Sequence, residues 1–142
     1  MKEIFPYILA IAAGIFTTLE ASLNSQLGEL VSPKVATLHS LLVGSLVMFV
    51  ASILSGSLNE YHKVLNIRFL LLIGGIFGAL IIYFTTKAVP KLGITTTLTM
   101  VIAAQILSSL YFDIFVLKQQ RLDINKIFGA LLVLCGVYFI SE

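Results

Sequence analysis

The stretch FPYILAIAAGIFTTLEASL, residues 5–23, decides the fold, because Glu20 is its only charged residue. A helix of about 20 apolar residues crosses the hydrocarbon core of a bilayer. An acidic side chain inside such a helix is costly to keep, and it usually marks the path of an ion or a substrate. The stretch therefore predicts a transmembrane helix that carries a functional acid.

The composition extends this expectation to the whole chain. Its 142 residues are 58% hydrophobic and 11% charged, and the mean hydropathy is +1.04, values that exclude an ordinary soluble domain. We expect an all-α membrane protein that forms a single integral membrane domain over residues 1–142, with five transmembrane helices. The expected spans are approximately residues 4–24, 35–54, 67–86, 94–117 and 124–140.

Basic residues in the short loops predict the orientation, because cytoplasmic loops carry an excess of lysine and arginine. The side that holds the N-terminus would carry six of them, Lys2, Lys63, Arg68, Lys118, Arg121 and Lys126. The opposite side would carry three, Lys34, Lys87 and Lys91. We therefore expect predominantly an N-inside, C-outside orientation, although this modest bias leaves an oppositely oriented partner open. The sequence contains no basic cluster of the kind that would indicate nucleic-acid binding.

Three polar residues of the first span, Thr17, Glu20 and Asn24, share one helix face at three- and four-residue steps. A carboxyl group held in hydrocarbon can alternate between binding a proton and attracting a cation. The alternative is that Glu20 only hydrogen-bonds Asn24 and reaches outward to the interface. His39, one turn into the second span, could face Glu20 as a proton relay, or it could be an interfacial hydrogen-bonding residue.

The remaining polar candidates lie in the third and fourth spans. Gln105 is near mid-membrane, where an amide must bond another helix or line a wet cavity, and both alternatives stay open. Asp113 lies near the inner end of its span, where pairing with Lys118 or Arg121 is the alternative to a functional role. Tyr83 is a candidate aromatic wall.

Small residues at short spacing predict where helices pack, because close approach in lipid depends on small side chains. The predicted packing positions are Gly44, Gly74, Gly75, Gly78, Gly129 and Gly136. The pattern leaves open whether the neighbouring helix belongs to the same chain or to another copy. The sequence has no phosphate-binding loop, no metal-ligand spacing and no nucleophile paired with a base. It therefore predicts a protein that is not an enzyme and that needs neither cofactor nor metal.

Several short runs together resemble a known family. They are LEASLNSQLG at 19–28, GGIFGA at 74–79, VPKLG at 89–93, the segment from Ala104-Gln105 to Asp113, and GALLVLCGVYFI at 129–140. In this order they resemble the short YdcZ-like family of five-helix inner-membrane exporters, within the drug/metabolite transporter superfamily. The last run is also similar to the final helix of EamA-like transporters.

The resemblance implies a half-size repeat that an inverted second subunit completes. The partner would be an identical chain in an antiparallel homodimer, or a related five-helix chain in a heterodimer, and lipid would surround both. Alternating access between the inverted repeats would then move a small organic metabolite, or a cationic or amphipathic compound, across a bacterial inner membrane. Inversion would also bring Asp113 of one chain to the depth of Glu20 in the other.

One position departs from the family pattern, because the family more often has glutamine where this chain has Glu20. A glutamine cannot carry a proton, so proton coupling through Glu20 would be special to this chain. Its chemistry resembles that of the first-helix glutamate of small multidrug resistance transporters. The leading hypothesis is a secondary transporter in which Glu20 couples to protons, Asn24 orients it, and Gln105 with Tyr83 lines the cavity. The alternatives are a non-transporting membrane partner and an uncoupled facilitator.

Overall fold

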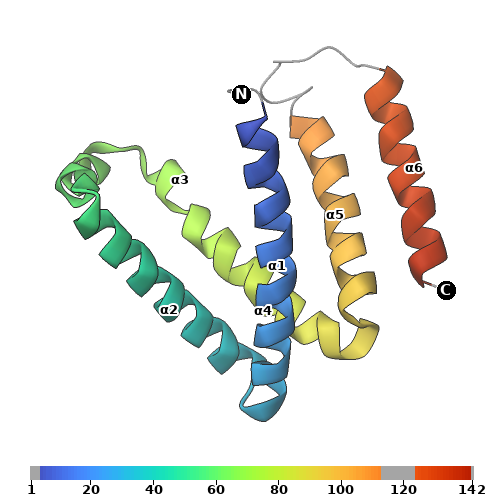
Figure 1. Cartoon of the computed structure of the whole chain (residues 1–142), viewed down its shortest axis with the longest axis horizontal. Coiled ribbons are helices and arrows are strands. Elements are labelled where there is room, and N and C mark those ends of the chain that lie inside the picture. Colours follow the sequence, from blue (N-terminus) through green and yellow to red (C-terminus); the bar gives the residue numbers. More distant parts are fainter. Residues whose placement is uncertain (1–3, 113–123, 142) are drawn as a thin grey trace. The chain divides into compact units, whose positions relative to one another are not determined.

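The computed structural model describes residues 4–112 and 124–141, and within these residues every regular element is helical (Figure 1). This confirms the expected all-α fold. The elements in chain order are α1 (Phe5–Leu30), α2 (Pro33–Leu54), the 3-10 helix η1 (Ser57–Asn66), α3 (Phe69–Leu72), α4 (Gly74–Leu92), α5 (Ile94–Tyr111) and α6 (Ile124–Ser141).

Four stretches in the described part of the chain are long and apolar enough to cross a membrane: α1, α2, the pair α3–α4 and α5. Between 6% and 11% of the residues in their most apolar windows are buried within the chain. The rest of this apolar surface must therefore face lipid or another chain. The fifth expected span is helical, and its apolar stretch, Ile127–Ile140, is shorter than the other four.

The structure corrects two expected helix boundaries. We expected the first span to end near residue 24, but α1 continues to Leu30. We also expected the third span to end near residue 86, but α4 continues to Leu92 and contains Pro90 in its last turn. A proline cannot donate the i→i−4 hydrogen bond, and only two helical residues follow it here. The connection is made instead by Gly93, whose φ of 81° is accessible to glycine without strain.

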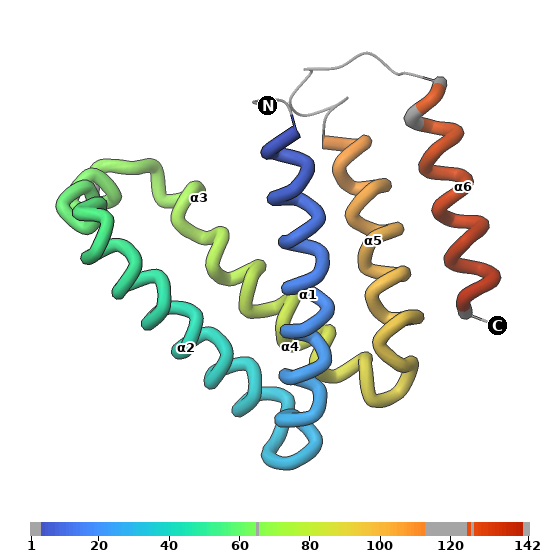
Figure 2. Tube along the Cα trace, in the orientation of Figure 1, coloured from blue at the N-terminus to red at the C-terminus, as the bar shows by residue number. Residues whose placement is uncertain are grey.

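A tight turn joins α1 to α2 and makes them antiparallel (Figure 2). The Ser32 side chain caps α2, because its Oγ accepts a hydrogen bond from the Val35 N–H at 3.2 Å. Pro33 follows at the first helical position, where its missing N–H costs nothing. The two helices pack against each other near this turn and diverge away from it (Figure 1).

A close contact between α1 and α4 lies near the turn that joins α1 to α2. A Cβ added at Gly28 would lie 2.7 Å from Thr86 Cγ2 and 3.8 Å from Ala36 Cβ. Ala36 is 0% exposed and Thr86 is 1% exposed. No atom in the described part of the chain hydrogen-bonds the buried Thr86 hydroxyl. This close contact at Gly28 is roughly 12 Å along α1 from Glu20, at 1.5 Å per residue.

The chain divides into two compact units, with the boundary between Pro90 and Lys91. In the second unit α5 and α6 pack against each other. Ala103 of α5 and Ala130 of α6 are both buried, as expected where small side chains allow helices to approach closely.

Candidate functional site

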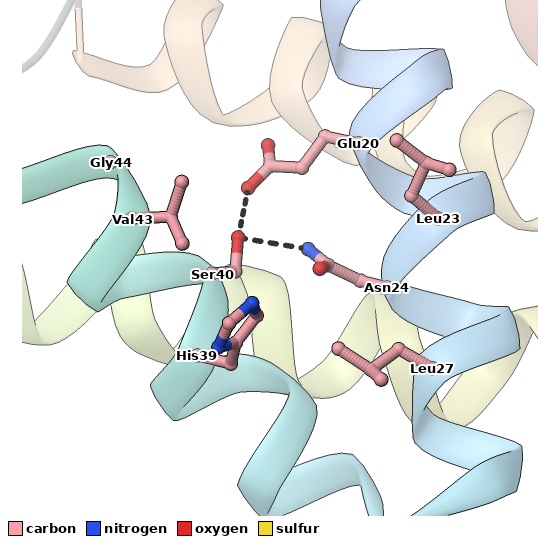
Figure 3. A pocket seen from close by; sticks show the side chains of 8 residues that line it. All are labelled: Glu20, Leu23, Asn24, Leu27, His39, Ser40, Val43 and Gly44. Carbon is pink, nitrogen blue, oxygen red and sulfur yellow. Dashed lines mark hydrogen bonds between the residues drawn. The ribbon is translucent and has the colours of Figure 1, made fainter. Parts of the chain in front are cut away.

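A pocket of about 610 Å³ opens between α1 and α2 (Figure 3). Each helix contributes side chains at three- and four-residue spacing, which places them on one helical face. The lining residues are Glu20, Leu23, Asn24 and Leu27 from α1, and His39, Ser40, Val43 and Gly44 from α2.

A short hydrogen-bond chain crosses this pocket from one helix to the other and back. The Asn24 amide donates from Nδ2 to Ser40 Oγ at 3.2 Å, and Ser40 Oγ donates to Glu20 Oε1, also at 3.2 Å (Figure 3). An amide N–H can only donate, so the single hydroxyl proton of Ser40 is directed to the glutamate. These two hydrogen bonds therefore hold one carboxylate oxygen of Glu20 in place.

The other oxygen of Glu20 is free to accept a further bond. Among residues 4–112 and 124–141, no side chain or backbone group donates to Glu20 Oε2. The Glu20 side chain is exposed, whereas Asn24, its support on the same helix, is 7% exposed. The pocket thus presents an open carboxylate oxygen on a buried polar support.

A direct hydrogen bond between Glu20 and Asn24 was the alternative to a functional role, and the structure links the two residues through Ser40 instead. Ser40 was not among the predicted site residues, although it lies one turn before Gly44 on the same face of α2. His39 lies next to Ser40 and lines the same pocket. The sequence placed His39 where it could face Glu20, and both residues line this pocket. The structure therefore brings Glu20, Asn24 and His39 together.

Two predicted residues of the same unit lie outside the pocket lining. The Thr17 hydroxyl donates to the Ala13 carbonyl at 2.9 Å, one turn back along α1. Tyr83 of α4 is partly buried, and its ring lies under the Lys87 ammonium, with 5.9 Å from Nζ to the ring centroid. This arrangement is a cation–π contact rather than a cavity wall.

The other two predicted site residues, Gln105 and Asp113, belong to the second unit. Gln105 lies on α5 with an exposed side chain. Asp113 lies outside the described residues. Their proposed functional roles stay predictions.

The predicted packing glycines are uncovered by the described residues of their own unit. A Cβ added at Gly74, Gly75, Gly78, Gly129 or Gly136 would meet no described atom within 4 Å. The same holds for Gly44, which lines the pocket instead of a helix contact. These close-approach surfaces are therefore available to a helix from outside their own unit.

The pocket has the size of a small-molecule site. Its volume is within the range of about 300–1,000 Å³ that is typical of ligand sites. Leu23, Leu27 and Val43 supply apolar wall, while the polar groups converge on Glu20. Within the described part of the chain, no three histidine, cysteine or acidic side chains are close enough to hold a metal ion.

Comparison with known proteins supports a membrane transport role for relatives of this chain. A family model described as "Putative inner membrane exporter, YdcZ" matches residues 5–139. The chain is 25% identical over 149 residues to "Inner membrane protein YdcZ" of Escherichia coli strain K12, and the alignment covers 100% of this chain and 98% of that protein. No solved structure matches the chain significantly.

Proposed function

The chain belongs to the YdcZ family of integral inner membrane proteins, and on that premise we propose that it exports a small organic compound in exchange for a proton bound by Glu20. The observation that carries this proposal is the carboxylate of Glu20, held through Oε1 by Ser40 and open at Oε2 toward a ligand-sized pocket.

One carboxylate can serve both partners of the exchange. An acid within a transmembrane helix is costly unless a proton or a counter-charge compensates it. A proton on Glu20 removes the negative charge that attracts a cation, so a proton and a cationic substrate compete for the same carboxylate. Binding of one therefore favours release of the other, which is the condition for exchange when the site alternates between the two membrane faces.

A second, inverted chain would complete the transporter. Two features support this arrangement: the exposed Glu20 side chain and the uncovered glycines at positions 74, 75 and 78. In a bilayer, polar side chains and surfaces of small residues usually pack against another helix. The partner is a second copy or a related five-helix chain, inverted relative to this N-inside, C-outside subunit. Gln105 of either chain is a candidate residue of the shared cavity.

The test is flux in liposomes that contain the purified protein and an enclosed pH-sensitive dye. A panel of membrane-impermeant cationic, neutral and anionic compounds is applied across an imposed pH gradient. We expect at least one class to move uphill and to release protons in the wild type. Glu20→Gln, which keeps the shape but cannot exchange a proton, is expected to lose this proton release.

Glu29→Gln is the matched control, because Glu29 is also an exposed acid of α1 but does not line the pocket. Uphill movement by Glu20→Gln at the wild-type rate would disprove coupling through Glu20. Movement without any response to the pH gradient would instead identify an uncoupled facilitator.

The uncovered glycines also favour a second candidate function, a non-transporting partner that stabilises another membrane protein. Cross-linking in native membranes separates the two candidates. Capture of a copy in the opposite orientation supports the transporter, whereas one fixed heterologous partner without flux of any compound supports the scaffold.

A further inference from the structure

We propose that the pocket between α1 and α2 selects a protonated organic amine with an apolar body, and that Gly44 sets the largest body the pocket accepts. The inference rests on the proposed function and adds to it the chemical class of the substrate and a residue that determines specificity.

The charge of the pocket selects a cation. Among its lining residues Glu20 is the only acid, none is lysine or arginine, and a neutral His39 adds no positive charge. An anion would therefore meet an uncompensated negative charge in a region of low dielectric. A neutral ligand would leave the ionised carboxylate without a counter-charge, whereas one positive charge on the ligand neutralises it.

The hydrogen bonds of the pocket select a cation that can donate. Glu20 Oε2 has no donor within the described residues, while Oε1 is already bonded to Ser40. A protonated amine places an N–H on Oε2 and forms a charge-assisted hydrogen bond, which is stronger than one between neutral groups. A quaternary ammonium ion has no N–H, so it gains only the charge attraction.

The walls select an apolar body attached to the amine. Leu23 and Leu27 line one side and Val43 lines the other. A hydrocarbon group placed between them is removed from water and gains about 25 cal/mol for each Å² buried. The substrate therefore combines one amine head near Glu20 with a hydrocarbon or aromatic body.

Gly44 controls the room that is available to this body. It lies one turn beyond Ser40, so a side chain at position 44 would project on the same face of α2 as the Ser40 hydroxyl. A Cβ added there would meet no described atom within 4 Å. A larger residue would thus occupy pocket space without displacing protein.

The test is equilibrium binding to the purified protein in lipid nanodiscs, with the signal of empty nanodiscs subtracted. The probes are benzylamine, the bulkier 1-naphthylmethylamine, benzyltrimethylammonium, and benzyl alcohol as the neutral counterpart. We expect both amines to bind at least about tenfold more tightly than benzyl alcohol, and benzylamine to bind more tightly than benzyltrimethylammonium. Glu20→Gln is expected to lose this preference for charge.

Gly44→Val is expected to weaken naphthylmethylamine binding by about tenfold or more while changing benzylamine binding by less than about threefold. Gly14→Val is the control, since Gly14 is also a transmembrane glycine whose added Cβ would meet nothing, and it does not line the pocket. Elution as a single species verifies the fold of each variant, and Gly44→Ala provides a smaller step if valine is not tolerated.

Equal binding of benzyl alcohol and benzylamine would overturn the proposed substrate class. Parallel effects of Gly44→Val on both amines, or none on either, would overturn the role of Gly44. Because no gradient is present, binding is independent of transport. Amine binding that follows these expectations, together with an absence of flux, would disprove the proposed exchange and leave this inference standing.

Discussion

Ser40 donates a hydrogen bond to Glu20 across the space between α1 and α2, with 3.2 Å between Ser40 Oγ and Glu20 Oε1. The same hydroxyl accepts from Asn24, so one serine connects the two polar residues of the neighbouring helix. This geometry makes the acid of the first span part of a defined site, and it gives specific expectations for single substitutions.

Ser40→Ala removes both hydrogen bonds and leaves the buried Asn24 amide without its partner. We expect a loss of about 0.5–2 kcal/mol in the free energy of unfolding, the range for hydrogen bonds between membrane helices and for unpaired buried amides. Unfolding of the purified protein in mixed detergent measures the change. Ser45→Ala is the control, because Ser45 bonds only the Leu42 carbonyl of its own helix. Equal stability of the two variants would contradict the structural role of Ser40.

Asn24→Asp replaces the amide donor with an acceptor, so the Ser40 hydroxyl proton is no longer directed to Glu20 alone. We expect proton-coupled flux to fall by at least about tenfold, because the carboxylate loses its fixed hydrogen bond. The matched variant is Gln26→Glu, since Gln26 donates a similar bond to Ser22 on the same helix, 3.3 Å away and outside the pocket lining. If both variants lost the same fraction of flux, the effect would come from the added charge and not from the bond.

Gly28→Ala places a methyl group 2.7 Å from Thr86 Cγ2, where one of the two helices must shift. We expect destabilisation of about 1–3 kcal/mol from this overpacking. Thr86→Ser removes the Cγ2 methyl group and should restore most of the loss in the double variant. Gly14→Ala, where the added methyl meets nothing, should leave stability unchanged or raise it. If the stability losses of Gly28→Ala and Thr86→Ser simply add in the double variant, the contact between these two residues is not the cause of the destabilisation.

Thr86→Val replaces a buried hydroxyl that has no hydrogen-bonding partner in the described chain. A methyl group of the same shape carries no desolvation penalty, so we expect the variant to be more stable by about 1 kcal/mol. Thermal unfolding in detergent would detect the shift. A loss of stability would show instead that the hydroxyl bonds a group contributed by the assembled protein.

Reporter fusions at the two termini test the orientation predicted from the basic loops. We expect the N-terminal fusion to lie on the cytoplasmic side and the C-terminal fusion on the opposite side in most copies. Lys63→Gln combined with Arg68→Gln reduces the charge bias and should increase the inverted fraction. An unchanged distribution would mean that these two loop residues do not set the orientation.

The membrane fold and the polar face of α1 were predictable, because each depends on local regularities. Composition predicts the apolar helices, and the four-residue step from Glu20 to Asn24 places both on one face whatever surrounds them. Ser40 was not predictable as their partner. Its position opposite Glu20 depends on how α2 is rotated about its axis after the turn at Ser32, which spacing alone does not define.

The misplaced boundaries have the same origin. Glycine often marks the end of a helix, but Gly28 lies inside α1, where its lack of a side chain permits the close approach of Thr86. Proline usually ends a helix, but Pro90 lies in the last turn of α4, where only two helical residues follow it. Glycine and proline can each end a helix or lie inside one, and only the tertiary packing determines which of the two occurs.

The sharp reversal at Ser32-Pro33 means that both pocket walls are encoded within one continuous segment, residues 20–44. Pairing of neighbouring helices closes a short loop, and contacts that are local in sequence form quickly. Because chains are synthesised from the N-terminus, these walls can meet before α4, α5 and α6 exist. Assembly of the pocket walls can therefore precede completion of the polypeptide, and the later helices would join walls that are already in place.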